Sequence, residues 1–258
     1  MRPLWTGAIG FGLVNIPVKL FSATSASELD LDMLDKKDHS HIRYVRVNEK
    51  TGKEIPWENI VKGYKLNNRY VVLDDKDFET ANAVKTKVIE ISDFVDEKEI
   101  DSVYFETPYY LAPDKSGDRA YALLREALLK TGKVGIASFV MRNKEGLAIL
   151  RASGNIIILN RMRFAEEIRN TNEITTPSKT TIKPGELKMA ISLINQLSGK
   201  FDIKQYKDTY TAQLLKIIRA KAKGTKPAVP QLKVVHSRTK DLMEQLKASL
   251  GTKRKKAS

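Results

Sequence analysis

The chain of 258 residues contains no cysteine, which excludes disulfide bonds, thiolate zinc sites and a cysteine nucleophile and fits a reducing compartment. It has no run of about eighteen apolar residues, so we expect neither a transmembrane helix nor a membrane partner. It also lacks the G-x-x-x-x-G-K-S/T loop that cradles nucleotide phosphates, and no lysine motif marks a nucleophile for nucleotidyl transfer. These absences predict a cytoplasmic protein without nucleotide chemistry.

Side chains that could hold a metal ion are few. Three histidines are present, and only His39 and His41 lie close together, beside Asp38. Two groups of aspartates could be imagined as the magnesium cluster of a nuclease: Asp30, Asp32 and Asp35, and Asp74, Asp75 and Asp77. Both groups are more simply explained as carboxylates at helix starts or in solvent. We therefore expect no catalytic residues, no metal site and no cofactor.

Positive charge is concentrated towards the end of the chain. Residues 199–258 hold 16 Lys and Arg against 4 Asp and Glu, a net charge of +12, whereas residues 1–198 hold 29 against 27, a net charge of +2. Such an asymmetry indicates a polyanionic partner, nucleic acid before an anionic membrane surface, although a basic tail can also be merely solvated. The expected location is the nucleoid.

The segment 4–20 is nearly uncharged and allows two interpretations. A secretory signal peptide would use Arg2 as its basic start, but glycines and a proline interrupt the apolar run and oppose a helix. A strand is favoured, because the alternation of apolar residues changes phase near Leu13 and Val14, which predicts a β-bulge in one bent strand. On this interpretation the mature chain retains Met1 or Arg2.

Residues 41–73 read as short strands separated by turns, with neither face cleanly apolar. This suits a projecting arm, and because ten extended residues reach about 33 Å while the two grooves of B-DNA together span about 18 Å, the arm could cross a duplex. The predicted DNA contacts in it are Arg43, Arg46, Lys50, Lys53, Lys62, Lys65 and Arg69. Such a hairpin needs support, for example from a second subunit. The alternative is a mixed-charge surface hairpin without a ligand.

A meander of antiparallel strands is predicted over 134–162, because the turns between its apolar segments are short. Earlier strands are expected at 87–92 and 103–113, followed by a helix with one apolar stripe at 118–132. With the N-terminal strand, these elements favour a mainly β fold with some α. A closed or nearly closed barrel is expected, because closure removes exposed sheet edges.

After residue 170 the pattern becomes helical, with helices predicted at 184–199 and 204–223. A proline-containing linker at 225–231 precedes a short amphipathic helix within 234–250. The apolar stripe of that helix is a predicted docking site for another protein: Leu242, Met243, Leu246 and Leu250. The alternative is that the helix folds back onto its own chain. The basic tail, included among the DNA-binding residues, is Lys253, Arg254, Lys255 and Lys256.

Six sequence blocks in a fixed order are spread over nearly the whole chain: WTGAIGFGLVNIPVKL at 5–20, IVKGY at 60–64, YVVL at 70–73, YYLAP at 109–113, AYALLREAL at 120–128 and DLMEQLKASL at 241–250. Together they resemble the bacterial Ku proteins, and the combination is far more specific than any single motif. The resemblance implies a Ku-type β-barrel core over 1–183 with a DNA-encircling arm at about 41–73. It also implies a helical dimer-clasping arm over 184–224 and, over 225–258, a linker, a ligase-docking helix and a basic tail.

The resemblance implies a function as well. The expected protein is a homodimeric ring that threads onto double-stranded DNA ends without reading sequence, during non-homologous end joining. Its expected partners are DNA ends, a second copy of the chain and an ATP-dependent DNA ligase. It is expected to be a clamp and not an enzyme. The rival hypotheses are a magnesium-dependent nuclease and a general basic chromatin protein, the latter with no preference for ends.

Overall fold

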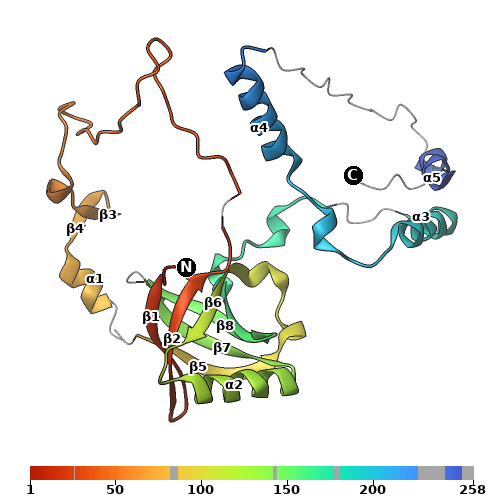
Figure 1. Cartoon of the computed structure of the whole chain (residues 1–258), viewed down its shortest axis with the longest axis horizontal. Helices are drawn as coiled ribbons and strands as arrows, with labels where there is room; N and C mark the ends of the chain where they lie inside the picture. The colour runs from red at the N-terminus through yellow and green to blue at the C-terminus, as the bar shows by residue number, and fades with distance from the viewer. Residues whose placement is uncertain (26, 82–86, 142–143, 177–180, 226–241, 252–258) are drawn as a thin grey trace. The chain divides into compact units, whose positions relative to one another are not determined.

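The computed structural model describes residues 1–25, 27–81, 87–141, 144–176, 181–225 and 242–251. The chain divides into two compact units. The first consists of Met1–Ala26 and Leu31–Thr171, and the second of Ser27–Asp30 and Asn172–Ser258. The described strands belong to the first unit, and the three C-terminal helices belong to the second (Figure 1).

The core of the first unit is a closed barrel of seven strands, in the order β1-β2-β6-β9-β8-β7-β5. The strands are β1 (Trp5–Phe11), β2 (Val14–Ser22), β5 (Val88–Asp96), β6 (Phe105–Pro113), β7 (Lys133–Met141), β8 (Lys144–Ser153) and β9 (Ile156–Met162). All neighbours pair antiparallel except β1 and β5, which are parallel. The prediction of a mainly β fold with a closed barrel is confirmed.

The barrel closes where β1 approaches β5. The two strands pair from Ala8 opposite Val88 to Gly10 opposite Glu90. A Cβ atom on Gly7 would lie 2.2 Å from the Lys87 carbonyl oxygen, and one on Gly10 would lie 2.6 Å from the Glu90 carboxylate. Glycine is therefore required at Gly7, where a Cβ would meet the backbone of the neighbouring segment, whereas at Gly10 a Cβ would instead displace neighbouring side chains.

The N-terminal segment forms β-structure, which was favoured over a signal peptide. The prediction of a single bent strand with a β-bulge is wrong. Residues 5–22 form two strands, β1 and β2, with Phe11 paired to Val14 and only Gly12 and Leu13 between them. Gly12 has a φ of 56°, the left-handed conformation that glycine adopts at the first position of some two-residue hairpin turns. The change of phase therefore marks the point where the chain reverses.

The interior of the barrel is filled by apolar side chains that alternate along the strands, among them Ile9, Leu20, Leu111, Leu150 and Leu159, each with no exposed surface. The helix α2 (Asp118–Thr131) packs on β7 and β8 and adds Tyr121, Leu124 and Leu128 to the same cluster. It ends at Gly132, whose φ of 68° provides the left-handed C-terminal cap. The helix predicted here is confirmed.

Several short elements lie outside the barrel strands and the long helices. A ribbon of β3 (Lys62–Leu66) and β4 (Arg69–Leu73) precedes the helix α1 (Asp75–Ala81). The described 3-10 turns of the chain are η1 (Trp57–Asn59), η2 (Glu97–Glu99), η3 (Ser102–Tyr104), η4 (Ala165–Glu167), η5 (Thr171–Glu173) and η6 (Ile203–Gln205). The ribbon is a separate two-stranded sheet, so it takes no part in the barrel.

The second unit contains α3 (Pro184–Leu197), α4 (Thr209–Ala222) and α5 (Leu242–Gly251). Proline opens α3, as predicted, because it lacks the N–H that the first turn cannot use. The helix expected from residue 204 begins only at Thr209, because the Asp208 carboxylate caps it by accepting a hydrogen bond from Thr211 N at 3.1 Å. None of the described helices is long and apolar enough to span a bilayer.

Candidate nucleic-acid interface

The ribbon β3–β4 is the most regular part of the segment 41–73. The strands pair from Lys62 opposite Leu73 to Leu66 opposite Arg69. The turn between them is Asn67–Asn68, and both residues have positive φ, at 46° and 63°. Asparagine tolerates this conformation, and a two-residue turn that uses it twice matches the twist of a hairpin. The predicted turn chemistry is therefore found here.

The basic side chains of the ribbon lie on both of its faces. Residues directly opposite each other share a face, so Lys62 and Arg69 fall on one face and Lys65 on the other, beside Tyr70. The Lys62 ammonium group lies over the Phe78 ring, 4.6 Å from its centroid. Every side chain of the ribbon except Leu73 is exposed. The ribbon therefore presents positive charge in two directions and buries almost nothing.

A second, smaller hairpin precedes the ribbon. Val47 pairs with Glu54, and the Asn48 carboxamide oxygen accepts hydrogen bonds from Lys50 N and Thr51 N, both at 3.0 Å. Lys50 and Lys53 therefore flank a turn held by a side chain. Just before this hairpin, the Arg46 guanidinium lies 4.5 Å from the centroid of the Trp57 ring. Such a contact orients the cation without neutralising its charge.

The seven predicted DNA contacts of the segment 41–73 are all exposed, and none forms an ion pair with another residue that the structure describes. They are Arg43, Arg46, Lys50, Lys53, Lys62, Lys65 and Arg69. Elsewhere in the first unit the described ion pairs are formed by barrel residues and their neighbours. Within the described part of the chain, these cations are therefore not matched by an acidic side chain.

Aspartates that could be imagined as metal ligands from the sequence instead accept hydrogen bonds from backbone N–H groups close to them in the chain. The Asp74 carboxylate accepts a hydrogen bond from Asp77 N at 3.0 Å, and the Asp77 carboxylate accepts one from Asp74 N at 2.9 Å. The Asp38 carboxylate accepts a hydrogen bond from Ser40 N at 2.9 Å, which lowers the pKa of that carboxyl. Among the described residues, no three His, Asp or Glu gather where they could hold a metal ion.

The predicted docking helix forms α5, and it contacts α3. The carboxamide nitrogen of Gln196 donates a hydrogen bond to Leu250 O at 3.4 Å, and the Met243 methyl group would lie 3.7 Å from a Cβ on Gly185. Met243, Leu246 and Leu250 are each partly buried. This contact agrees with the alternative expectation, in which the helix folds back onto its own chain. A partner's use of the same residues stays a prediction.

Some predicted residues lie outside the part of the chain that the structure describes. These are the basic tail, Lys253, Arg254, Lys255 and Lys256, residues 226–231 of the predicted linker, and residues 234–241 at the start of the segment in which the amphipathic helix was predicted. Leu242 is the first residue of α5, and only its backbone is described. Their assignment to DNA binding or to partner binding stays a prediction.

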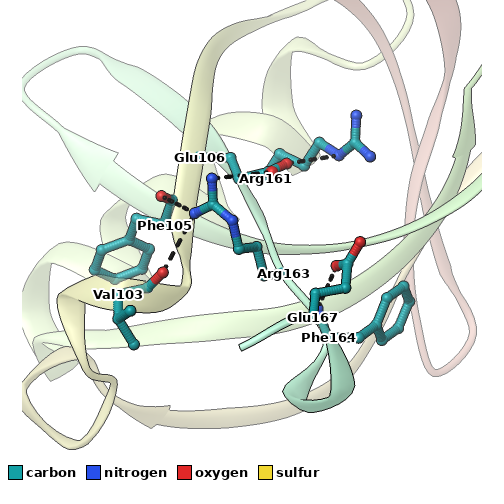
Figure 2. A network of polar contacts seen from close by, with 7 residues as sticks. All are labelled: Val103, Phe105, Glu106, Arg161, Arg163, Phe164 and Glu167. Carbon is teal, nitrogen blue, oxygen red and sulfur yellow. Dashed lines mark hydrogen bonds and ion pairs between the residues drawn. The ribbon is translucent and has the colours of Figure 1, made fainter. Parts of the chain in front are cut away.

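A polar cluster at the end of β9 was missed by the sequence reasoning (Figure 2). The Glu106 carboxylate lies 3.1 Å from Arg161 Nε and 3.3 Å from Arg163 Nη2. Arg163 also donates hydrogen bonds to Val103 O and Phe105 O, at 3.3 and 3.1 Å. One signal was available: Arg161 continues the inward alternation of Ile157 and Leu159, where an apolar residue is expected.

Comparison with known proteins defines the class of this barrel. A family model described as the Ku70/Ku80 beta-barrel domain matches residues 10–189, which is more than half of the chain. The chain therefore belongs to the Ku family, and the resemblance seen in the sequence blocks is confirmed.

Individual relatives agree with this assignment. The chain is similar to the non-homologous end joining protein Ku of Coxiella burnetii, with 40% identity over 98% of this chain and 96% of that protein. It is 39% identical to the non-homologous end joining protein Ku of Bacillus subtilis, over 99% of this chain and 83% of that protein. The protein of the same name from Pseudomonas aeruginosa is 39% identical over 94% of this chain and 85% of its own length.

Proposed function

We propose that the protein binds double-stranded DNA ends without reading their sequence and acts in non-homologous end joining as a clamp, not as an enzyme. The observation that carries this proposal is the set of exposed arm cations that have no ion-pair partner among the described residues. Membership of the Ku family and the names of its relatives supply the reaction context.

The arm cations suit phosphates better than bases. Lysine and arginine side chains that project in several directions from an extended ribbon can follow a charged backbone, whereas base readout needs side chains fixed in one groove. The arm has no described cluster of buried side chains that would hold Arg43, Lys62 or Lys65 in one geometry. Affinity without sequence discrimination follows from this arrangement.

A homodimeric ring is the second part of the proposal. A two-stranded ribbon with exposed faces is marginally stable by itself, and a second copy of the chain would give it something to rest on. The second unit also exposes large apolar side chains, including Leu187, Ile191, Ile194, Phe201 and Tyr206. Such a surface favours association, and we assign the clasp between subunits to α3 and α4.

Recruitment of an ATP-dependent DNA ligase is the third part. Its proposed docking residues are Leu242, Met243, Leu246 and Leu250 on α5. Three of these side chains form a partly buried apolar set on one short helix, the kind of face that a helix-binding groove accepts.

The experiment that tests the clamp compares a linear duplex with a closed circular duplex of the same sequence and length. A ring that threads onto ends binds the linear duplex and fails to load on the circle. Binding of both with equal affinity would contradict the ring and would favour a general basic chromatin protein. The same linear duplex, labelled and incubated with magnesium ions, should remain intact, and sustained cleavage by the purified protein would contradict the clamp.

A further inference from the structure

One end of the barrel contains a pocket of about 320 Å³, lined by Leu4, Tyr109, Met141, Lys144 and Arg161, which we call the barrel-mouth pocket. Met141 is the last residue of β7 and pairs with Lys144, the first residue of β8. Arg161 is close to the end of β9, and Leu4 immediately precedes β1. The pocket therefore lies at the end of the barrel where these strands begin or stop.

Arg161 points towards the barrel interior. It pairs with Ala148, which belongs to the buried core cluster, so both residues face the same side of the sheet. Gly146, two residues before Ala148, lies beside the Arg161 side chain. A Cβ at Gly146 would lie 3.3 Å from the Phe139 ring and 3.9 Å from Arg161 Nε, so the absence of a side chain there leaves space for the guanidinium group. A guanidinium group thus replaces the apolar side chain that would otherwise complete the core at this end.

Among the described residues, Arg161 is paired with Glu106 on one side of its guanidinium group only. Its Nε atom is buried and lies 3.1 Å from Glu106 Oε2, yet that N–H makes no hydrogen bond with any described residue, so the two atoms are close without being well aligned. Figure 2 shows Glu106 on the Nε side of Arg161, with the two terminal nitrogens turned away from it. No described acidic residue lies against the two terminal nitrogens, so they are the part of Arg161 that an anion in the pocket could contact.

The charges around the pocket favour an anion. Lys144 and Arg161 are the charged residues in the described lining of the pocket, and both are positive, while Glu106 lies 3.1 Å from Arg161 Nε. Positive charge of this kind suits a phosphate monoester, which carries a charge of roughly −1.5 to −2 at neutral pH. Arginine also fits phosphate oxygens through paired N–H donors.

We propose that the barrel-mouth pocket binds a nucleoside monophosphate, either free or as the terminal nucleotide of a DNA 5′ end. Arg161 and Lys144 hold the phosphate, and the walls formed by Leu4, Tyr109 and Met141 take the flat base. The volume supports a ligand of this size, because pockets for small molecules begin at about 300 Å³. This site is separate from the arm cations, so it does not depend on the proposed DNA contacts.

Calorimetric titration of the full chain with dAMP, inorganic phosphate and deoxyadenosine tests the proposal. We expect saturable binding of dAMP, tighter than that of either fragment, because dAMP alone uses both the cations and the apolar walls. No saturable binding of dAMP would overturn the proposal, and inorganic phosphate binding as tightly as dAMP would overturn the assignment to a nucleotide.

Variants assign the binding to the pocket. Arg161→Gln and Lys144→Gln should each weaken dAMP binding about tenfold or more, and Lys130→Gln, which changes an exposed lysine on α2, should leave it unchanged. Lys144 forms no described ion pair with Glu106, so Lys144→Gln leaves that cluster intact. It therefore still tests the proposal if Arg161→Gln fails to fold. Glu106→Gln should tighten binding, because it removes the competing carboxylate. Equal affinity in wild type and Lys144→Gln would contradict the assignment.

The source of the nucleotide is settled by duplexes that carry either a 5′ phosphate or a 5′ hydroxyl group. If the ligand is a DNA end, the wild type prefers the phosphorylated duplex and Arg161→Gln loses that preference. If the ligand is a free nucleotide, both duplexes bind alike to both proteins while dAMP binding is still lost in the variant. Failure of dAMP binding leaves the comparison of linear and circular DNA untouched, so the two proposals fail separately.

Discussion

The barrel and the arm of residues 41–73 lie in the same compact unit, but they differ in whether their charged side chains form ion pairs. In the barrel unit, Lys19 lies 3.1 Å from Asp114, and Arg161 and Arg163 lie beside Glu106. The hydrogen bond from Lys19 and its positive charge lower the pKa of the Asp114 carboxyl. In the arm, the cations are exposed and have no such partner among the described residues.

Apolar residues differ in the same way. Barrel side chains such as Leu150 and Leu159 are fully buried, whereas Tyr64, Leu66 and Tyr70 of the ribbon are each more than half exposed. A segment that neither buries its apolar groups nor pairs its charges contributes little to its own stability. The apolar packing and the described ion pairs that stabilise the first unit are therefore concentrated in and around the barrel, and residues 41–73 leave both their charged and their apolar side chains exposed.

The largest expected effect is the salt dependence of DNA binding. If six to ten arm cations of a dimer contact phosphates, affinity for a linear duplex should fall by roughly 10³ to 10⁵ between about 50 and 200 mM salt. Fluorescence anisotropy at a series of salt concentrations gives the slope of log K against log salt. A slope near zero would show that the arm cations do not act on phosphate.

Leu150→Ala should lower the free energy of unfolding by about 2–5 kcal/mol, because it opens a cavity in a fully buried site. The matched change in the arm, Leu66→Ala, removes a side chain that is 53% exposed and should alter the free energy of unfolding by about 0.5 kcal/mol or less. Denaturant titration measures both variants. Equal losses would mean that the arm is part of the cooperative core.

Tyr121→Phe should cost about 1–3 kcal/mol. The Tyr121 hydroxyl group donates a hydrogen bond to Leu111 O at 2.5 Å and accepts one from Ile157 N at 2.7 Å, so its removal takes one hydrogen bond from each of two buried backbone groups. Tyr64→Phe in the arm is the control and should be neutral. If Tyr121→Phe lowered the free energy of unfolding no more than the control does, the two hydrogen bonds of the Tyr121 hydroxyl group would not have the stabilising role given to them.

The same tyrosine predicts a dependence on pH. Burial raises the pKa of Tyr121 above its ordinary value of 10.0. The folded state therefore holds this proton more tightly than the unfolded state, so the contribution is complete below pH 10 and is lost as the pH rises through the raised value. The free energy of unfolding, measured by denaturant titration at a series of pH values in this range, should decrease more steeply with pH for the wild type than for Tyr121→Phe.

Gly132→Ala should cost about 1 kcal/mol, because Gly132 ends α2 with a φ of 68° that a Cβ disfavours. Gly52 has nearly the same φ, 65°, and likewise has open space where a Cβ would lie. Gly52→Ala carries the same local strain in the arm and should leave the unfolding of the barrel unchanged. A loss of the same size in both variants, measured by thermal unfolding, would remove the distinction between the regions.

The sequence predicted the barrel better than it predicted the details of its strands. Alternating apolar residues and short turns over 134–162 identified β7, β8 and β9, because both signals are local. The turn at Gly12 was read as a bulge, since a phase change accompanies either a bulge or a reversal of the chain. The pairing of β1 with β5 joins distant segments, and single-sequence patterns do not specify such partners.

The site was predictable in part. The segment 41–73 was singled out from its charge and its turns, which are properties of consecutive residues, and its role as a DNA-contacting arm stays a prediction. The cluster of Glu106 with Arg161 and Arg163 was not found, because these residues come together only through the pairing of β6 with β9. The contact between α3 and α5 could be stated only as an alternative for the same reason.

The central claim is that the exposed cations of residues 41–73 provide the contacts to the phosphates along the DNA duplex. Its most direct test is the affinity of the double variant Lys62→Glu/Lys65→Glu for a linear duplex, compared with Lys98→Glu/Lys130→Glu, which makes the same change of net charge at exposed lysines outside the arm. We predict a loss of roughly 10²-fold for the arm variant on every duplex sequence and little change for the control. Equal affinities of the two variants would contradict the account.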